Sequence, residues 1–309
     1  MTKSNLIRRN GKRIVIGAED QAYIGLDVHK KSTNVAVRLG GQKVAEWISR
    51  SAPAAVISSL QPLRKAAEKV VYEAGPCGYG LYRKLREARF PAEVWPPGKI
   101  PRKANPGNKT DRLDASTLAE YGEKDLVEPM VVPTRTEEAH RQVMRARNQI
   151  MEKQKRVKQQ IKSFLLMHGI EEPEGLKHWS KKGVRQLMEL ELTGELQMCL
   201  QMHLEMLAQV QHAKKQITDK LRCMSRSERY RQDFQNLTTH PGVGLLTAMN
   251  FILELYQPER FEVHRQVSTM LGLVPRFASS GERQTDKGLI GAGRESLRSM
   301  LVDAAWQWV

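Results

Sequence analysis

Cysteine and long apolar runs are scarce in this sequence of 309 residues, and acidic residues are fewer than basic ones. Its three cysteines, Cys77, Cys199 and Cys223, lie far apart without a paired spacing, which excludes a disulfide framework and the common zinc-binding patterns. No apolar run approaches the roughly 18 residues that span a membrane, and the basic amino terminus lacks the apolar core of a secretion signal. We therefore expect a soluble, intracellular protein without a membrane partner.

Positive charge is abundant instead. Lys and Arg number 50 against 34 Asp and Glu, a formal net charge of +16 with histidine neutral. Such an excess is typical of proteins that bind a polyanion. The length suits roughly two domains. Composition divides the chain into a basic flexible tail at 1–20, an α/β domain at 21–130, a helical arm at 131–225 and an all-α domain at 226–309.

Apolar runs separated by turn residues predict an α/β fold for the second segment. The expected strands are 22–28, 32–39, 43–48, 69–73 and 92–95, with helices at 53–67 and 78–89 and another from about residue 111. This order, βββαβαβα, is that of an RNase H-like fold, in which carboxylates from strand ends and a late helix meet at one edge of the sheet.

Four acidic residues occupy the strand ends and the late helix of this domain: Asp27, Glu73, Asp111 and Asp114. Asp27 and Glu73 each end an apolar run, where a charge is costly unless it meets a cation. The i, i+3 spacing of Asp111 and Asp114 puts both on one helical face. Each residue alone is typical of a capping or surface carboxylate. Together they predict a site for Mg²⁺, with two ions stabilising the attacking and leaving oxygens of a phosphodiester.

Long helices rich in basic residues are expected from about residue 136. The segments 137–168 and 183–222 carry apolar residues at helical spacing and predict a coiled-coil or hairpin arm. Positive charge is dense on the first of them, and its candidates for contact with a nucleic-acid backbone are Arg141, Arg145, Lys153 and Arg156. The alternative is that these residues form an ordinary solvated helical face.

The last segment contains a turn and a loop with possible roles at phosphate. The sequence HPGVGLLTA at 240–248 matches a helix-hairpin-helix turn, in which Gly242 and Gly244 let the backbone approach a phosphate; a plain turn between helices fits it as well. Helices are expected at 244–256, at 264–272 and from 294. Between them, the loop 276–293 holds two serines, Ser279 and Ser280.

Positive residues surround these serines in the sequence, and the cations are Arg276, Arg283 and Lys287. A serine nucleophile needs such cations to hold the phosphate under attack, but it also needs activation, and no dedicated base is evident. Serine beside glycine is in addition ordinary loop chemistry.

These motifs together resemble the DEDD transposases of the insertion-sequence-110 family, the recombinases guided by a bridge RNA. The resemblance covers about 21–306 and rests on YIGLDVHK at 23–30, YEAGPCGY at 72–79, KTDRLDA at 109–115, PGVG at 241–244, LGLVPR at 271–276, SSG at 279–281 and the residues 297–306. It implies a RuvC-like amino-terminal domain holding the acidic tetrad, a coiled-coil linker and a helical transposase domain.

The resemblance also implies roles for individual residues. Ser280 would attack DNA and form a covalent phosphoserine intermediate, with Ser279 as the competing position. Lys109 and Arg112, inside the KTDRLDA motif, join the candidates for nucleic-acid contact. A noncoding bridge RNA would pair with donor and target DNA, so the protein would read backbone and shape. Exchange of two duplexes favours a dimer or tetramer, and the family suggests the prokaryotic cytoplasm, at the nucleoid.

The chain departs from the family at two places in its carboxyl-terminal part. Ile290 runs into Gly291, where a Ser or Thr followed by Lys is common, and the chain stops at Val309 where relatives continue through further helices. Two alternatives to an RNA-guided recombinase stay open. One is a metal-dependent endonuclease like the Holliday-junction resolvases, with no covalent intermediate. The other is a catalytically inactive, RNA-binding remnant.

Overall fold

The computed structural model describes residues 5–9, 12–17, 19–101, 115–280, 283–289 and 293–308. Contacts divide the chain into two compact units, Met1–Val132 and Pro133–Val309. Each unit has hydrophobic clusters of its own. Within the described ranges, no helix combines the length and the apolar character needed to cross a membrane.

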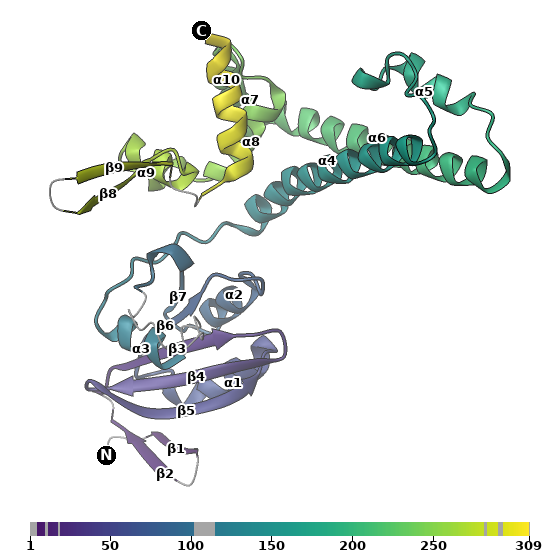
Figure 1. The fold of residues 1–309 in the computed structure, drawn as a ribbon. Helices are drawn as coiled ribbons and strands as arrows, with labels where there is room; N and C mark the ends of the chain where they lie inside the picture. Colours follow the sequence, from purple (N-terminus) through teal and green to yellow (C-terminus); the bar gives the residue numbers. More distant parts are fainter. Residues whose placement is uncertain are drawn as a thin grey trace. The chain divides into compact units, whose positions relative to one another are not determined.

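A five-stranded mixed sheet forms the centre of the first unit (Figure 1). The strand order is β5-β4-β3-β6-β7, with antiparallel pairing among β3, β4 and β5 and parallel pairing of β3 with β6 and of β6 with β7. The strands are β3 Ala22–Val28, β4 Ser32–Leu39, β5 Gln42–Arg50, β6 Ala67–Glu73 and β7 Ala92–Trp95. The helices are α1 Pro53–Leu60, α2 Gly80–Glu87 and α3 Ala115–Glu123. The predicted α/β order is confirmed.

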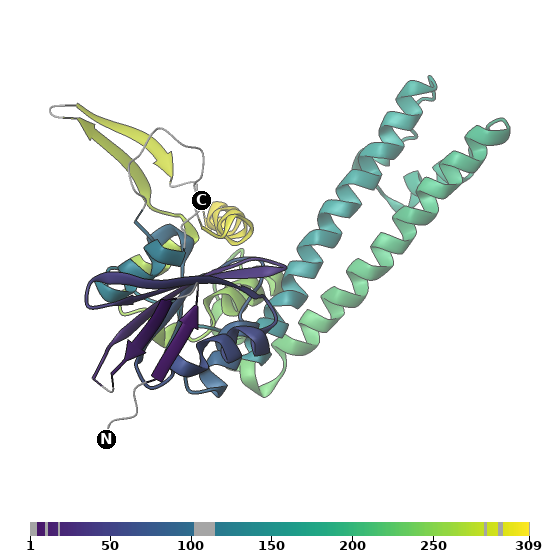
Figure 2. The same ribbon diagram turned by 90° about the horizontal axis from the view of Figure 1, so that it is seen from below.

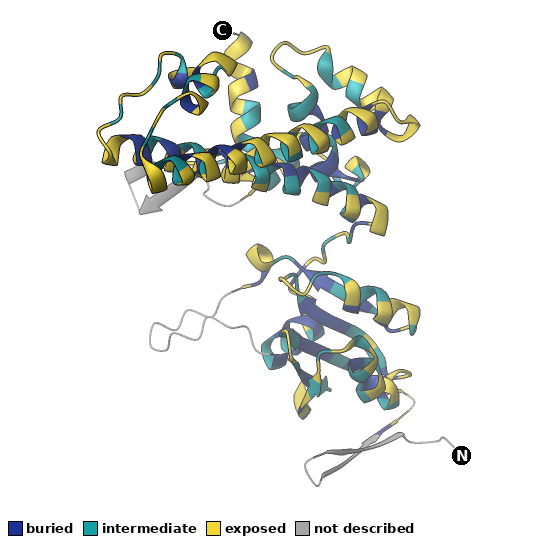
Figure 3. Cartoon of the chain, turned by 90° about the vertical axis from the view of Figure 1, so that its right-hand side faces the viewer, coloured by how far each residue is buried: buried dark blue, intermediate teal, exposed yellow. Residues whose placement is uncertain are grey.

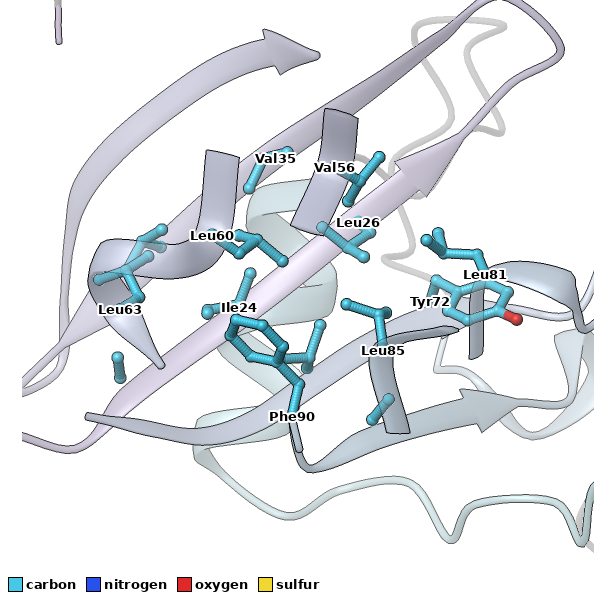
Figure 4. Close-up of a cluster of buried hydrophobic side chains, with 14 of the residues drawn as sticks. Ile24, Leu26, Val35, Val56, Leu60, Leu63, Tyr72, Leu81, Leu85 and Phe90 are labelled. Atoms are coloured by element: carbon cyan, nitrogen blue, oxygen red, sulfur yellow. The ribbon is translucent and has the colours of Figure 1, made fainter. Parts of the chain in front are cut away.

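Alternation along β3 gives the sheet two different faces. Ile24 and Leu26 are buried in the cluster that α1 and α2 complete with Leu60 and Leu85 (Figure 4). Gly25, between them in sequence, belongs to the opposite face, as its contacts with α3 show. The same alternation assigns every second residue of β3 to the side of the sheet that α3 covers.

Helix α3 lies directly on that second face. A Cβ atom on Gly25 would lie 2.0 Å from the carbonyl oxygen of Ala115 and 2.6 Å from the amide nitrogen of Ala119. A larger residue therefore cannot replace Gly25 without a shift of α3. Farther along the helix, a Cβ on Gly122 would lie 3.7 Å from the side chain of Lys69, near the start of β6. Helix α3 thus begins toward the carboxyl ends of β3 and β6 and runs back toward their amino ends.

The predicted helix at 53–67 is too long. Helix α1 ends at Leu60, a single turn of 3₁₀-helix follows at Gln61–Leu63, and β6 begins at Ala67. Pro62 explains the early end, because proline has no N–H to continue the α-helical hydrogen bonds.

The segment at 1–20, expected as a flexible tail, contains two antiparallel strands, β1 Asn5–Arg9 and β2 Lys12–Ile16. The sequence between them is Asn-Gly, a pair that favours tight hairpin turns. Ile16 is 2% exposed and joins the core of the first unit. The expectation gave weight to the basic composition and overlooked the apolar residues of both strands.

Two long helices form the arm of the second unit, α4 Arg135–Met167 and α6 Gly194–Ser225 (Figure 1, Figure 2). They run antiparallel, because Arg147 Nε donates to Thr218 Oγ1 at 3.3 Å while Gln154, farther along α4, accepts from Lys214, farther back in α6. Buried residues follow the facing sides of the two helices (Figure 3). The antiparallel pair agrees with the predicted hairpin arm.

The single helix predicted at 183–222 is two helices. Helix α5 covers Lys181–Met188, and α6 starts at Gly194, whose φ of +39° is unfavourable for other residues. Leu176 and Leu187 pack with Leu200 of α6 at this end of the arm. The prediction of one continuous helix rested on the spacing of apolar residues, which does not reveal the break.

Glu137 fixes the start of α4. It forms a capping box with Thr134, in which each side chain accepts from the other residue's backbone N–H. Its carboxylate also accepts from Arg229 Nη2 at 3.0 Å and from Gln257 Nε2 at 2.9 Å. These bonds lower the pKa of Glu137 although burial acts to raise it. The first turn of α4 is thereby tied to two later segments of the second unit.

Helices and one β-hairpin complete the second unit. They are α7 Glu228–Thr238, α8 Leu245–Leu255, α9 His264–Leu271, β8 Pro275–Ser280, β9 Arg283–Leu289 and α10 Glu295–Ala305. Single turns of 3₁₀-helix lie at Leu176–His178, Pro258–Arg260 and Trp306–Trp308 in this unit and at Pro97–Lys99 in the first. The prediction of an all-α domain with a loop at 276–293 is therefore wrong. Strands pair through backbone groups, so a polar, glycine-containing sequence did not exclude a hairpin.

Candidate catalytic and nucleic-acid-binding sites

Asp27 lies at the carboxyl end of β3 with two polar partners. Its Oδ2 atom is 2.9 Å from His29 Nε2 and accepts from Asn34 Nδ2 at 3.2 Å. Asn34 is the cross-strand partner of Asp27 in the β3–β4 pair. The Asp27 side chain is 20% exposed, so it is shielded but still reached by solvent. Both contacts fall on Oδ2, and Oδ1 takes no part in them.

Glu73 lies at the same edge of the sheet. The parallel register pairs Leu26 of β3 with Tyr72 of β6 as its last pair, so Asp27 and Glu73 each follow directly after it. Both residues are one position beyond core residues of the α1–α2 face, and alternation assigns them to the face that α3 covers. The sheet thus brings together the two strand-end carboxylates predicted from the sequence.

The other two members of the predicted tetrad, Asp111 and Asp114, lie outside the described residues, as do Lys109 and Arg112. The helix that follows them is described from Ala115 onward. Its first residue lies against Gly25, two positions before Asp27 on the same face of β3. Helix α3 therefore begins at the edge where Asp27 and Glu73 lie.

A divalent cation suits the donors at this edge. Hard cations such as Mg²⁺ take oxygen ligands, and carboxylates are the ligands they meet most often in proteins. Among the residues that the structure describes, no three His, Cys, Asp or Glu side chains gather as a ready metal cluster. Asp27 and Glu73 supply oxygen donors of the right chemistry, and a complete set requires donors from elsewhere in the chain.

Ser279 and Ser280 are the last two residues of β8, and Ser280 pairs with Arg283 of β9 next to the turn. The side chains of 276–287, which include those of Arg276 and Lys287, lie outside the described part.

Arg141, predicted to contact nucleic acid, is buried. Its side chain is 4% exposed, and Nη2 donates to Glu254 Oε2 at 2.9 Å. Its guanidinium also lies over the ring of Tyr256, 4.7 Å from the centroid. The prediction for Arg141 is wrong, because a side chain inside the α4–α8 contact cannot reach a ligand strand at the surface.

The other candidates on α4 are accessible. Lys153 and Arg156 are exposed. The side chain of Arg145 is 40% exposed, and its Nε lies 3.6 Å from Glu254 Oε1. Helical spacing predicted charge on this helix correctly but did not distinguish residues that face α8 from residues that face solvent.

The two glycines of the PGVG turn have different surroundings. Gly242 has φ +76°, and a Cβ on it would lie 2.6 Å from the carbonyl oxygen of Ala304 in α10. Gly242 is thus needed for packing between the turn and α10. Gly244 caps α8, and no described atom lies within 4 Å of its Cβ position. The N-terminal backbone of α8 is open at Gly244.

Three functional candidates were missed from the sequence. Asn34 and His29 hold Asp27, and the short connection between β3 and β4 could have indicated that Asn34 stands opposite Asp27. Glu254 lies inside the apolar run at 251–255, and no signal in its neighbourhood marks it as the acceptor for several arginines.

Comparison with known proteins points in one direction. Residues 24–169 match a DEDD domain of IS110 elements, described as "Transposase", and residues 234–309 match the "Transposase IS116/IS110/IS902 family". A protein of Sinorhizobium fredii named "Putative transposase y4qE" is 32% identical over 93% of this chain and 72% of its own length. The transposase for insertion sequence element IS1533 of Leptospira borgpetersenii is 26% identical over 93% of this chain and 85% of its own length.

Proposed function

Because the chain belongs to the IS116/IS110/IS902 family of transposases, we propose that it cuts and rejoins DNA strands during transposition of an insertion sequence. In this proposal Asp27, Glu73, Asp111 and Asp114 form the metal-binding tetrad. Ser280 is the nucleophile. The observation that carries the proposal is the parallel register that leaves Asp27 and Glu73 at one edge, where α3 begins.

A DEDD transposase domain implies dependence on a divalent metal. A pair of Mg²⁺ ions bound at this edge would offset the negative charge of a phosphodiester. The ions would also favour ionisation of an attacking hydroxyl. The chain itself would supply and orient the carboxylate oxygens that bind the metal. Asn34 and His29 contact Oδ2 of Asp27, and in this proposal Oδ1 binds the metal. Asp114 directly precedes Ala115 in sequence, which supports its delivery to the same edge.

The serine step exchanges one ester bond for another. The Oγ atom of Ser280 bonds to phosphorus and its hydroxyl proton passes to water. The bridging oxygen of the cut strand leaves and is protonated to a hydroxyl. In the reverse step a strand hydroxyl attacks the phosphoserine, restores the serine and joins the new strand, so no bond energy is lost between cutting and joining.

A guide RNA accounts for how such a protein selects its sites. We propose that a noncoding bridge RNA pairs with donor and target DNA while the protein holds backbones. The net charge of +16 and the exposed cations Lys153 and Arg156 on α4 support this role. The open backbone at Gly244 supports phosphate contact by the helix-hairpin-helix-like turn. Two duplexes require at least two nucleophiles, which favours a dimer or tetramer.

The test is a search for a covalent protein–DNA product. Purified protein with its copurifying RNA, labelled DNA and Mg²⁺ should give a protein-linked band on a denaturing gel. Ser280→Ala should bind RNA and DNA normally but give no linked band, whereas Ser279→Ala should keep most of the activity. A linked band lost only in Ser279→Ala would move the role by one residue. Metal-dependent cleavage without any linked band would favour a resolvase-like endonuclease that uses water.

A further inference from the structure

Three arginines of the second unit converge on one carboxylate. Glu254 of α8 is bound by Arg141 Nη2 at 2.9 Å, by Arg294 Nε at 3.1 Å and by Arg145 Nε at 3.6 Å. We call these four residues the arginine junction. They come from α4, from α8 and from the N-cap of α10.

The arginine junction has more positive charge than its own acid can balance. Three guanidiniums against one carboxylate leave a net charge of +2. The pKa of Glu254 is lowered by Arg141, Arg294 and Arg145, although burial acts in the opposite direction. Glu254 is therefore ionised, and its single negative charge interacts with all three arginines. Arg141 is paired with Glu254 in the interior, so the excess charge lies on Arg145 and Arg294, and an anion at the junction would offset the repulsion between them.

A fourth arginine adds to this excess. Arg260 stacks on Tyr256 with its guanidinium carbon 4.2 Å from the ring centroid, on the ring that Arg141 also covers. Its pKa is lowered, first by burial, with repulsion from Arg141 and Arg294 adding to the effect. The Nε atoms of Arg141 and Arg260 are both buried without a hydrogen-bond partner among the described residues.

Two members of the junction open to solvent. The side chain of Arg145 is 40% exposed and that of Arg294 is 45% exposed, while Glu254 beneath them is 9% exposed. Both arginines contact Glu254 through Nε. A partly exposed guanidinium that is held at Nε suits the forked recognition of a phosphate.

Neighbouring groups extend the same surface. Arg294 is the N-cap of α10, and no described side chain caps the first amides of this 11-residue helix. Those amides favour an anion through hydrogen bonds and the helix dipole, and the exposed Glu295 in the same turn opposes one. Asn148, one turn beyond Arg145, donates to Ser296 Oγ at 2.9 Å and so fixes α4 to the first turn of α10. The exposed arginines and the helix start are thus held in one place.

We propose that the arginine junction is a binding site for one backbone phosphate of a nucleic-acid strand, gripped by Arg145, Arg294 and the first amides of α10. Glu254, on the buried side of the site, orients the guanidiniums of Arg145 and Arg294. Arg141 is a positioning residue that keeps Glu254 ionised and in place. The choice of a nucleic acid as ligand rests on the proposed function, and the anion site itself rests on the geometry alone.

The direct test compares two pairs of charge-matched variants in the full-length protein. Arg145→Gln combined with Arg294→Gln removes the two partly exposed guanidiniums of the junction. Arg231→Gln with Arg265→Gln removes two exposed arginines of α7 and α9 and serves as the control. Affinity for a labelled duplex DNA and for a labelled structured RNA is measured by fluorescence anisotropy over a range of KCl concentrations.

The junction pair should weaken binding of one nucleic acid by roughly tenfold or more. It should also reduce the slope of log affinity against log salt by about 0.7–0.9, the value for one phosphate. The control pair should keep the wild-type slope. A loss of affinity for DNA alone or for RNA alone identifies which nucleic acid binds at the junction. Equal slopes for the junction pair and the wild type, or equal losses in both pairs, would overturn the proposal.

Two further measurements keep the result interpretable. Arg145→Lys with Arg294→Lys preserves charge and should keep the salt slope while weakening affinity several-fold, because lysine lacks the fork; wild-type affinity in this pair would contradict the assigned geometry. Inorganic phosphate should raise the melting temperature of the wild type above that in chloride of equal ionic strength, and the Gln pair should lose this shift. Neither readout needs DNA cleavage, so they stand even if the proposed transposase chemistry fails.

Discussion

The carboxyl edge of the sheet in the first unit and the arginine junction in the second have opposite charge balance. At the edge, Asp27 and Glu73 end adjacent strands, and the hydrogen-bond partners of Asp27 are His29 and an uncharged amide. At the junction, one carboxylate faces three arginines. An edge with excess carboxylate suits a cation, and a junction with excess guanidinium suits an anion. Phosphoryl transfer requires both functions.

The largest expected effect concerns the edge. Asp27→Asn keeps the size of the side chain and removes its charge, and cleavage of labelled DNA should fall by at least roughly a hundredfold, since loss of an outer-shell partner alone costs about 10–100-fold. Asp111→Ala and Asp114→Ala should behave alike. Nucleic-acid binding, measured by anisotropy, should be unchanged or tighter because the protein becomes more positive. Substantial cleavage by Asp27→Asn would remove this edge from the mechanism.

The next effect concerns the acid of the junction. Glu254→Gln leaves Arg141 buried without its counter-charge, so the free energy of unfolding should fall by about 3–5 kcal/mol. Urea denaturation at neutral pH measures it. Glu259→Gln, an exposed position in the turn of 3₁₀-helix that follows α8, is the control and should change stability by less than about 0.5 kcal/mol. A similarly small loss of unfolding free energy in both variants would mean that the ion pairs of Glu254 contribute little to stability.

The stability conferred by Glu254 should also depend on pH. Its folded pKa is lowered, chiefly by Arg141 among the three arginines, against the opposing effect of burial. The stabilisation is therefore complete above the unfolded pKa of about 4.3 and is lost as the pH falls through the lower folded value. The difference in unfolding free energy between wild type and Glu254→Gln should shrink as the pH falls below about 5. A difference that grows on acidification would contradict the assignment.

A smaller effect tests how closely the edge depends on α3. Gly25→Ala places a Cβ 2.0 Å from the backbone of α3, and the strain should reduce stability by about 1–3 kcal/mol. Because α3 must shift at its start, cleavage should decline even at temperatures where the variant is folded. Gly80→Ala, at the start of α2 with no described atom near its Cβ position, should be neutral in both assays. Normal cleavage by folded Gly25→Ala would separate α3 from the site.

The smallest effect asks whether positive charge acts locally or across the whole arm. Changing Lys153, Lys155 and Arg156 to Gln removes three exposed charges of α4. Each lost phosphate contact should lower the salt slope by about 0.7–0.9. An unchanged slope, together with a reduced slope in the junction variants, would confine binding to the junction and leave this face of α4 to solvent.

Much of the first unit could be predicted from the sequence because its signals are local. The apolar runs that end at Asp27 and Glu73 gave the strands, and parallel pairing then brought the two acids to one edge. Pro62 was a local signal as well, but it was outweighed by the apolar spacing around it. The helix start that completes the edge depends on the contact of Gly25 with Ala115, 90 residues later in sequence, and pattern alone does not predict such a contact.

The second unit was harder to predict because its informative contacts are distant in sequence. Arg141 and Arg145 lie one turn apart on α4, yet one is buried and the other half-exposed. Their difference arises from α8, more than 100 residues later. The hairpin with Ser280 was missed for a related reason, since its order comes from backbone pairing and its side-chain composition is that of a loop.

The anchorage of α4 through Glu137 has a mechanical consequence. The helix has 33 residues, so it is about 50 Å long at a rise of 1.5 Å per residue. Glu137 clamps one end to Arg229 and Gln257, and the opposite end is bound within the arm itself, to α6 and to the segment carrying Leu176. Contacts with α8 and α10 hold the first turns of α4 as far as Asn148, and about 28 Å of the helix extends beyond that residue. A pivot of about 5° there would move the far end by roughly 2.5 Å over that length, so small changes in packing at the base of the arm are enlarged at its tip.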